Sequence, residues 1–281
     1  MLDKFLVRRM TRSELNTVIA WAETEGWNPG RDDADSFYNT DPQGFFVGVL
    51  NQEVIGAISA VAYDQSYGFI GFYLVKPEYR GRGYGYAIWQ EAMAYMGDRN
   101  VGLDGLIVQQ ANYEKSGFQV AYRHIRYETE GGGEYPHYPG LVDLSTVSLT
   151  ELAKYDRLVF PSERTKFLQN WLIPPGRFAL GAISDNQLVG YGVIRPSYQG
   201  FRIGPLFANN RQIAEVLLDG LLAKVDSEPV FIDVPDINPE AIALVTSRNM
   251  NTVFPAARMY TKGSPNLYLE RIFGVTSLEL G

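Results

Sequence analysis

The stretch from Phe69 to Gln90 reads F-I-G-F-Y-L-V-K-P-E-Y-R-G-R-G-Y-G-Y-A-I-W-Q and decides the fold. Its first residues are apolar and aromatic, as in a buried strand, and Pro77 ends that strand. A loop with three glycines follows, and then Ile88, Ala92 and Tyr95 recur at helical spacing. A strand that passes through a glycine-rich turn into a helix brings unpaired backbone N–H groups and the positive end of the helix dipole to one point. The stretch therefore predicts a phosphate site, most simply for a pyrophosphate.

The glycine pattern separates this loop from two common nucleotide-binding loops. A Walker loop would have lysine followed by serine or threonine at the helix start, where the chain has Gly83, Tyr84 and Gly85. A dinucleotide fingerprint would require glycine at the position of Tyr86. An R-x-x-G-x-G pattern, which begins at Arg80, does fit. An ordinary glycine turn between a strand and a helix is the simpler alternative for the same residues.

A second motif, Y-E-K-S-G-F, runs from Tyr113 to Phe118. It has the form of a helix C-terminus, with Lys115 in the last turn and Gly117 as a left-handed stop before a new strand. Together with the R-x-x-G-x-G loop, this motif resembles the GNAT superfamily of N-acyltransferases. The resemblance is specific in the first half of the chain, where both motifs lie.

The GNAT resemblance implies a binding site for acetyl-CoA as co-substrate. In that family the glycine loop wraps the CoA pyrophosphate, and the strand before it splays from its neighbour and pairs with the pantetheine arm. The cofactor-binding residues implied here are Leu74, Val75, Arg80, Gly81, Arg82, Gly83, Tyr84, Gly85 and Tyr86. The resemblance further implies that the Val75 N–H polarises the thioester carbonyl, as the donors of an oxyanion hole do.

Tyr113 is the second catalytic residue that the resemblance implies. The matching tyrosine of the family protonates the departing CoA thiolate, and a phenol suits that role because it is uncharged at neutral pH. Simple packing of Tyr113 on an amphipathic helix is the alternative. The chain also departs from the family pattern, since the asparagine that often lies one to two turns earlier is out of register and Asn112 is adjacent instead.

The segment from Glu25 to Tyr38 combines acidic and aromatic residues around a Pro-Gly turn. In GNAT-like proteins the segment after the first helix forms one wall of the acceptor pocket. The substrate-binding residues that this implies are Glu25, Trp27, Asp32, Asp33 and Asp35. Carboxylates and aromatic rings suit an ammonium-bearing acceptor, through charge pairing and cation–π contact. Alternatively, Asp32 or Asp33 only caps the short helix that runs to Tyr38.

Composition excludes several function classes. The chain has 281 residues, a net charge of −7 and no cysteine. The negative charge argues against a nucleic-acid partner, and the lack of cysteine excludes a disulfide framework, a thiol nucleophile and a thiolate metal site. His124 and His137 are not spaced as metal ligands, so we predict no metal. The N-terminus has no apolar signal core and no stretch reaches bilayer length, so we expect a cytoplasmic protein without membrane contact, of an oligomeric state that the sequence does not indicate.

The segment from Thr129 to Gly140 holds three consecutive glycines and two prolines, which predicts a domain boundary. We therefore divide the chain into residues 1–130 and 131–281. The second part repeats the predicted order β-α-α-β-β-β-α-β-α-β of the first, which indicates a tandem duplication. The predicted fold class is α/β, of the α+β kind: two GNAT-like folds, each with a mixed, mostly antiparallel central sheet flanked by helices.

The second copy lacks the phosphate loop. Residues 206–211 read L-F-A-N-N-R where the first half has R-G-R-G-Y-G. Without glycine the backbone amides cannot approach a pyrophosphate closely, so we expect one acyl-CoA site. The degenerate second domain then serves as a lid, a pocket wall or a structural support. Asp233 is interpreted as a salt-bridge partner of Arg195 or Arg202, with a place in the acceptor pocket as the alternative.

The sequence predicts an acetyl-CoA-dependent N-acetyltransferase that acts on the primary amine of a small polar or cationic molecule. Because no cysteine is available for an acyl-enzyme, we expect the amine to attack the thioester directly in a ternary complex. Two alternatives remain. One is a non-catalytic acyl-CoA-binding sensor whose second domain is the output, and the other is a nucleotide-binding protein that uses the glycine loop.

Overall fold

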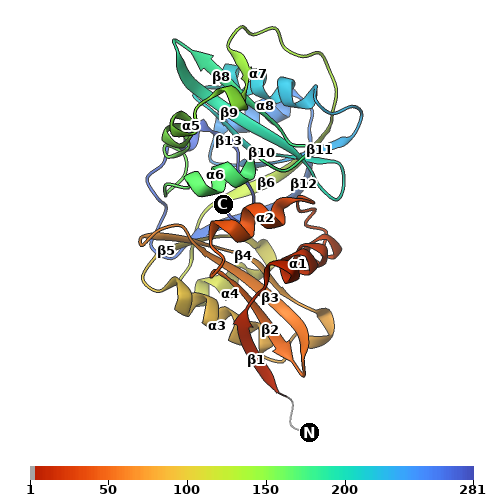
Figure 1. Cartoon of the computed structure of the whole chain (residues 1–281), viewed down its shortest axis with the longest axis vertical. Coiled ribbons are helices and arrows are strands. Elements are labelled where there is room, and N and C mark those ends of the chain that lie inside the picture. The colour runs from red at the N-terminus through yellow and green to blue at the C-terminus, as the bar shows by residue number, and fades with distance from the viewer. Residues whose placement is uncertain (1–3) are drawn as a thin grey trace.

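The computed structural model describes residues 4–281 (Figure 1). No helix in that range is long and apolar enough to span a membrane. The first repeat contains β1 (Phe5–Arg9), α1 (Arg12–Thr24), α2 (Asp33–Thr40), β2 (Phe45–Leu50), β3 (Glu53–Ala62), β4 (Tyr67–Val75), α3 (Tyr84–Met96), β5 (Asn100–Leu106), α4 (Gln110–Lys115) and β6 (Gln119–Glu130).

The second repeat follows the same order of strands and helices, so the predicted duplication is confirmed. One additional strand, β13, comes after the repeated elements. The second repeat contains β7 (Leu141–Asp143), α5 (Leu149–Asp156), α6 (Thr165–Trp171), β8 (Phe178–Ser184), β9 (Gln187–Pro196), β10 (Phe201–Ala208), α7 (Arg211–Leu222), β11 (Pro229–Pro235), α8 (Pro239–Ser247), β12 (Asn251–Tyr260) and β13 (Ile272–Gly274).

Two hairpins show how local sequence produces the repeat. β2 and β3 are joined through Asn51 and Gln52, with φ of 49° and 74°. β8 and β9 are joined through Asp185 and Asn186, with φ of 49° and 59°. Two successive left-handed residues make a turn whose twist matches that of paired strands, and Asn and Asp adopt this conformation more readily than most residues. The same turn therefore lies at the same place in each half.

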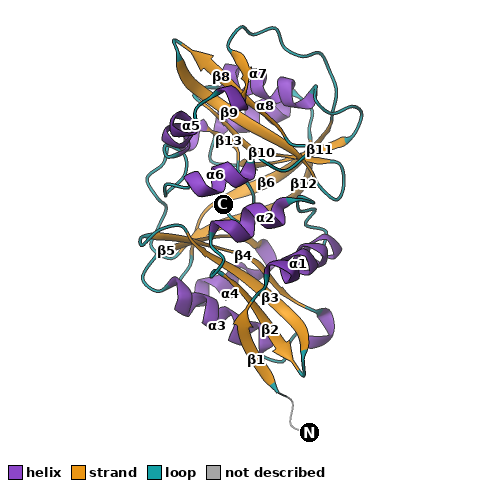
Figure 2. Cartoon of the chain, in the orientation of Figure 1, coloured by secondary structure: helices purple, strands orange, loops and turns teal. Residues whose placement is uncertain are grey.

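The strands of both halves form one continuous sheet in the order β1-β2-β3-β4-β5-β12-β6-β11-β10-β9-β8-β7, and β13 pairs with β10 (Figure 2). Strand β12, from the second repeat, pairs with β5 of the first. Strand β6, from the first repeat, pairs with β11 of the second, and β6 and β12 also pair with each other. Each half thus completes its sheet with the last strand of the other.

Because of this strand exchange, the boundary predicted at residue 130 separates two sequence repeats but not two independent sheets. The two repeats are still separate along the chain, on either side of the glycine-rich linker. In the structure, however, neither part forms a continuous sheet by itself. Strand β12 lies between β5 and β6 of the first part, and β6 lies between β12 and β11 of the second. Periodicity along a sequence identifies strands but does not indicate which edge each strand joins.

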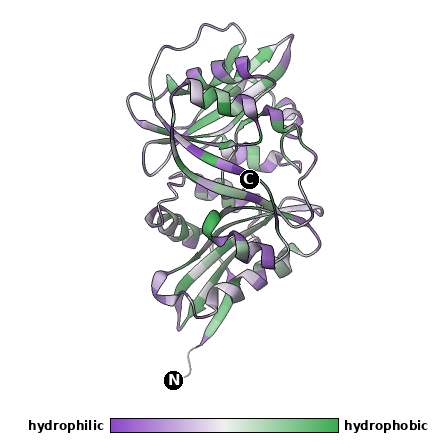
Figure 3. Ribbon diagram, turned by 180° about the vertical axis from the view of Figure 1, so that it is seen from behind, coloured by the Kyte–Doolittle hydropathy of each residue, from purple (hydrophilic) through white to green (hydrophobic). Residues whose placement is uncertain are grey.

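The hydrophobic core also continues from one half into the other. One buried cluster includes Phe37 and Phe72 from the first half and Trp171 and Tyr191 from the second. The rings of Phe37 and Trp171 stack with their centroids 5.8 Å apart. Figure 3 shows hydrophobic residues along the strands of both halves. A shared core favours a second half that supports the first over one that swings as a lid.

Candidate active site

A gap opens in the sheet where β4 and β5 part. The two strands pair in parallel only as far as Ile70 and Leu103. Just beyond, Phe72 has a φ of 46°, and the register of β4 on β3 shifts by one residue between Gly71 and Leu74. This is a β-bulge, which bends a strand and ends its pairing. The gap lies at the carboxyl ends of two parallel strands, the usual place of ligands in such sheets.

Backbone groups on the open edge of β4 alternate between β3 and the gap. The Lys76 N–H donates to the carbonyl of Ile55 at 2.9 Å, so the amide of Leu74, two residues earlier, also faces β3. Val75, which pairs with Gly56 between them, therefore turns its N–H group towards the gap. The backbone pairing with pantetheine that was predicted for Leu74 stays a prediction, although its amide faces β3 in this register. Val75 has the orientation that the prediction requires, and its role as the oxyanion donor stays a prediction.

The glycine loop leaves open space in front of α3. Gly81 and Gly83 have φ of 74° and 85°, and a Cβ on either residue would meet no atom within 4 Å. Gly85 differs, because its Cβ would lie 2.9 Å from the hydroxyl of Tyr73 and 3.2 Å from Val75. The third glycine thus lets the helix pack closely on β4, while the first two give the loop its left-handed backbone just before the positive end of α3.

Two arginines belong to this loop. Arg80 donates through Nε to the Val75 carbonyl at 2.7 Å and through Nη2 to the carboxylate of Glu25. The guanidinium of Arg82 lies 5.9 Å from the ring centroid of Tyr79. Glu25, predicted to bind the acceptor, therefore contacts the phosphate loop instead. Among the other predicted loop residues, Tyr84 starts α3 and the side chain of Tyr86 is exposed.

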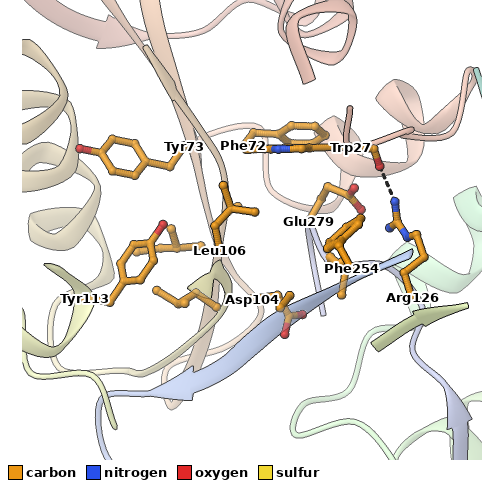
Figure 4. A pocket seen from close by; sticks show the side chains of 14 residues that line it. Trp27, Phe72, Tyr73, Asp104, Leu106, Tyr113, Arg126, Phe254 and Glu279 are labelled. Atoms are coloured by element: carbon orange, nitrogen blue, oxygen red, sulfur yellow. Dashed lines mark hydrogen bonds between the residues drawn. The ribbon is translucent and has the colours of Figure 1, made fainter. Parts of the chain in front are cut away.

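A cavity with about 60 Å³ of space open to water molecules extends from the gap into the interface between the halves. Figure 4 shows Tyr73 and Tyr113 on one side of it and Trp27, Phe254 and Glu279 on the other, with Leu106 between them. The first side adjoins the open edge of β4. The second side is made by residues from the α1–α2 loop, β12 and the segment after β13. Strand exchange thus brings distant parts of the chain to one cavity.

Tyr113 points into this cavity from α4. Its ring lies against Gly105 so closely that a Cβ there would be 2.5 Å from ring carbon Cε2, and the ring of Trp89 packs 5.6 Å away. Burial, with a smaller contribution from Tyr73, raises the pKa of Tyr113 to about 12. The phenol therefore holds its proton throughout the physiological range. These surroundings suit a neutral proton donor.

Buried ion pairs surround the far side of the cavity. Arg126 donates to Asp233 at 2.7 and 2.9 Å and to the backbone carbonyl of Trp27 at 2.6 Å. Arg202 donates to Asp233 at 2.5 Å and to Glu279 at 3.1 Å. The salt bridge predicted between Asp233 and Arg202 is thus present, whereas Arg195 pairs with a different aspartate. Burial alone would raise the pKa of Asp233, but the two arginines outweigh it and lower that pKa.

Asp104 and Glu279 are the two carboxylates that line the cavity, and Asp104 is fully paired. Its Oδ1 accepts from Arg258 Nε at 2.9 Å and lies 2.8 Å from His124 Nδ1, and its Oδ2 accepts from Arg258 Nη2 at 2.7 Å. Burial would raise the pKa of Asp104, but Arg258 and His124 outweigh it and lower that pKa. No group of three or more His, Asp or Glu side chains in residues 4–281 is placed to hold a metal ion.

The predicted acceptor residues are only partly brought together. Trp27 lines the cavity. Asp33 is buried between Arg177 and Arg195 at 2.8 and 3.0 Å, and therefore joins the two halves. Asp35 pairs with Arg12 at 2.6 Å, and with Asp32 it lines a separate open groove. Asp32 precedes α2 without a capping hydrogen bond from its side chain. Local sequence showed the carboxylates, but their partners lie far along the chain.

The second half has the same gap, but its own chain fills it. Strands β10 and β11 pair in parallel only as far as Ile203 and Ile232, as β4 and β5 do in the first half. Beyond that point β13 pairs with β10, at Leu206 and Phe207. The loop before α7 has no glycine, and the side chain of Asn210 caps the helix at 3.0 Å. The expectation of one acyl-CoA site therefore gains a structural reason, beyond the missing loop.

Comparison with known proteins gives consistent matches for both halves. Residues 13–118 match the model of the Acetyltransferase (GNAT) family, and residues 152–274 match that of the Acetyltransferase (GNAT) domain. The chain is 32% identical over 269 residues to holothin acyltransferase of Pseudoalteromonas sp. (strain SANK 73390), over 95% of this chain and 92% of that protein.

Two solved structures share the fold over almost the whole chain. A crystal structure of a protein from Pyrococcus horikoshii has a TM-score of 0.83 at 21% identity and covers 99% of this chain and 96% of its own. A tandem GNAT protein from the clavulanic acid biosynthesis pathway has a TM-score of 0.64 at 14% identity. The match covers 92% of this chain and 98% of that protein. At these identities the likeness concerns the fold alone.

Proposed function

This chain belongs to the GNAT acetyltransferase family, and from that premise we propose that it transfers the acetyl group of acetyl-CoA to a primary amine on a small, flat, largely apolar molecule. That the chain is an acyltransferase follows from its family and its relative. The acyl group, the acceptor and the roles of single residues are the proposal.

One arrangement carries this proposal. The free edge of β4, the N-terminus of α3 at the glycine loop and the ring of Tyr113 all adjoin one gap. An extended pantetheine arm along this edge would place the thioester carbonyl within reach of the amide of Val75. Such donors stabilise the charge on the carbonyl oxygen, and one of them contributes roughly 100- to 1,000-fold in rate in known enzymes.

The cavity lining changes our expectation about the acceptor. The sequence predicted a polar or cationic amine from the acidic segment around Asp32, but those carboxylates lie outside the cavity or in ion pairs. The walls on the acceptor side are instead mostly apolar, and Arg126 and Glu279 are the charged side chains on that side; the apolar residues are Trp27, Phe72, Phe254 and Leu278. Aromatic walls favour a flat ring system that stacks on them.

The reaction needs no group beyond the two substrates and the chain. The amine attacks the carbonyl carbon, the C–N bond forms and the C–S bond breaks. The attacking nitrogen loses one proton to water or to a nearby carboxylate, and Tyr113 gives its own proton to the departing sulfur, which leaves as the CoA thiol. Tyr113 then regains a proton from solvent. Binding both substrates side by side in a cavity removes much of the entropic barrier to their encounter.

The first experiment is calorimetric titration with acetyl-CoA, CoA and ATP, combined with a thiol-release assay. Holothin is the first acceptor to test, because a relative at 32% identity is named for it. Benzylamine represents a simple flat amine, and spermidine represents a polar cation. We expect acetyl-CoA to bind with a stoichiometry near one, since β13 occupies the second gap, and turnover with the flat amines to exceed turnover with spermidine.

Each rival function predicts a different result. A sensor would bind acetyl-CoA and turn over none of the amines. A nucleotide-binding protein would prefer ATP to CoA. Faster transfer to spermidine would overturn the proposed acceptor class and leave the acyltransferase activity intact. Parallel assays with propionyl-CoA and hexanoyl-CoA test whether the transferred group is acetyl.

A further inference from the structure

The segment that follows β13, residues 275–281, crosses from the second half to the first and ends against the cavity. The N–H of Val275 donates to the Asp233 carbonyl at 2.9 Å, and the hydroxyl of Tyr63 donates to the Leu280 carbonyl at 2.8 Å. Gly71, beside the bulge in β4, faces the backbone carbonyl of Glu279 so closely that no side chain fits between them. The segment is therefore held by both halves, with Glu279 between its two anchors.

The side chain of Glu279 is buried, with 4% of its surface exposed, and it lines the cavity. Its Oε1 accepts from Arg202 at 3.1 Å. Its Oε2 is shielded from solvent and has no hydrogen-bond partner in the part of the chain that the structure describes. A buried carboxylate oxygen without a donor is unfavourable in a folded protein, which indicates that a ligand supplies the missing donor.

The other cavity carboxylate cannot take this role in the same way. Both oxygens of Asp104 are already engaged, by Arg258 and His124. Nearby Asp233 also has each oxygen bonded to an arginine. Of the two carboxylates on the cavity wall, Glu279 is the one with an oxygen free of hydrogen bonds.

We propose that Oε2 of Glu279 accepts a hydrogen bond from the acceptor amine and takes its proton as the amine attacks. This inference rests on the proposed amine acetylation and adds the group that receives the proton. As the C–N bond forms, one proton passes from nitrogen to Glu279. As the C–S bond breaks, another passes from Tyr113 to sulfur. The net products are the amide and the CoA thiol, and one proton returns from Glu279 to Tyr113 through solvent.

The surroundings of Glu279 suit this task. Arg202 fixes one oxygen and is itself held by Asp233, so the second oxygen has a defined position. Trp27 and Phe254 on the same side of the cavity limit the water around it (Figure 4). A hydrogen bond to a charged oxygen is stronger in such an environment than in water. The catalytic acid thus comes from the first repeat and the catalytic base from the segment after β13.

The test compares Glu279→Gln with wild type in the thiol-release assay, with acetyl-CoA and holothin and, in parallel, benzylamine. We expect kcat/KM for the amine to fall about 100-fold or more, the range of a lost general base, while the Kd of acetyl-CoA changes less than twofold. The matched control is Glu270→Gln, the same change at an exposed glutamate of the C-terminal region, and it should retain wild-type activity.

A second variant separates chemistry from folding. Glu279→Ala removes the carboxylate and leaves space, so added formate should restore part of the turnover in Glu279→Ala and none in Glu279→Gln. Wild-type activity in Glu279→Gln overturns the assignment. So does a loss of turnover that formate does not restore and that parallels a loss of thermal stability and acetyl-CoA affinity. If wild type transfers acetyl to neither amine, the proposed acceptor class itself has failed, a result distinct from an active Glu279→Gln.

Discussion

Tyr113 is half-buried, with its ring against Gly105 and a tilted contact with the ring of Trp89. Replacing it with phenylalanine keeps the ring and removes only the proton. We expect Tyr113→Phe to lower kcat about 100-fold, as the loss of a general acid does, with little change in the Kd of acetyl-CoA. Steady-state kinetics and calorimetry measure both, with Tyr135→Phe, an exposed tyrosine, as the control. An unchanged kcat would return Tyr113 to a packing role.

The same burial sets the pH dependence of the donor. Because the pKa of Tyr113 is raised to about 12, its protonated form persists on the alkaline side of neutrality and is lost only near that value. We therefore expect kcat to show no fall between pH 8 and pH 10 that depends on Tyr113. Profiles of wild type and Tyr113→Phe should have the same shape in that range. A descending limb near pH 9 that is present only in wild type would contradict this assignment.

A residue within a motif can be identified from the sequence, whereas a residue that only lines the cavity cannot. Tyr113 was found because its neighbours form a recognisable helix end. Glu279 lies in T-S-L-E-L, a stretch without any motif, and its role depends on Arg202 and Gly71, which are far away in sequence. Asp33 presents the opposite case. It was predicted to bind the acceptor because it lies in an acidic segment, but its carboxylate forms ion pairs with Arg177 and Arg195.

Among the elements, the strand–loop–helix unit from β4 to α3 was predicted with its order, its glycines and the end of its strand before Pro77. The bulge at Phe72 was not predicted, because a left-handed phenylalanine has no sequence signature. That bulge changes the register of β4 on β3 and so affects which backbone groups face the gap.

The loop before α3 offers a test at this scale. Gly81→Ala places a side chain at a φ of 74°, which costs roughly 1–2 kcal/mol and obstructs the space before the helix. We expect the Kd of acetyl-CoA to rise about tenfold or more. Gly97→Ala is the matched control, because Gly97 ends the same helix at a φ of 57° and a Cβ there also meets no atom within 4 Å. Equal affinities for the two variants would argue against a phosphate at this loop.

At the scale of the whole molecule, buried charges join the halves. The pKa of Asp233 is lowered by Arg126 and Arg202 against the effect of burial, so its stabilising contribution is complete above the ordinary aspartate pKa near 4 and is lost as pH falls through its lower folded value. We expect Asp233→Asn to lower the free energy of unfolding by about 3–5 kcal/mol at pH 7, and the difference from wild type to narrow below pH 4. Urea titrations at pH 7 and pH 3 measure this, with exposed Asp226→Asn as the control. A constant difference would contradict the ion-pair explanation.

The exchanged strands make a second prediction for the whole molecule. A protease site inserted after Glu134, in the exposed part of the linker, would cut between the repeats without touching β6 or β12. The two fragments should stay together on size exclusion and keep at least half of the activity, because β12 still pairs with β5 and β6 with β11. Fragments that separate without denaturant would show that the strand pairing contributes less than we infer.

The exchange also bears on how the protein is made. A ribosome releases both family motifs by residue 118, yet the edge of β5 has no neighbour until residues 251–260 have emerged. At ordinary translation rates this delay is on the order of ten seconds or more. During that time the nascent chain carries a complete acyl-CoA motif beside an unpaired strand edge, the kind of surface that chaperones bind and that aggregates when left exposed. Catalytic competence therefore arrives only after residue 260 has been made, and a message interrupted before codon 251 yields a product with the motif and without the enzyme.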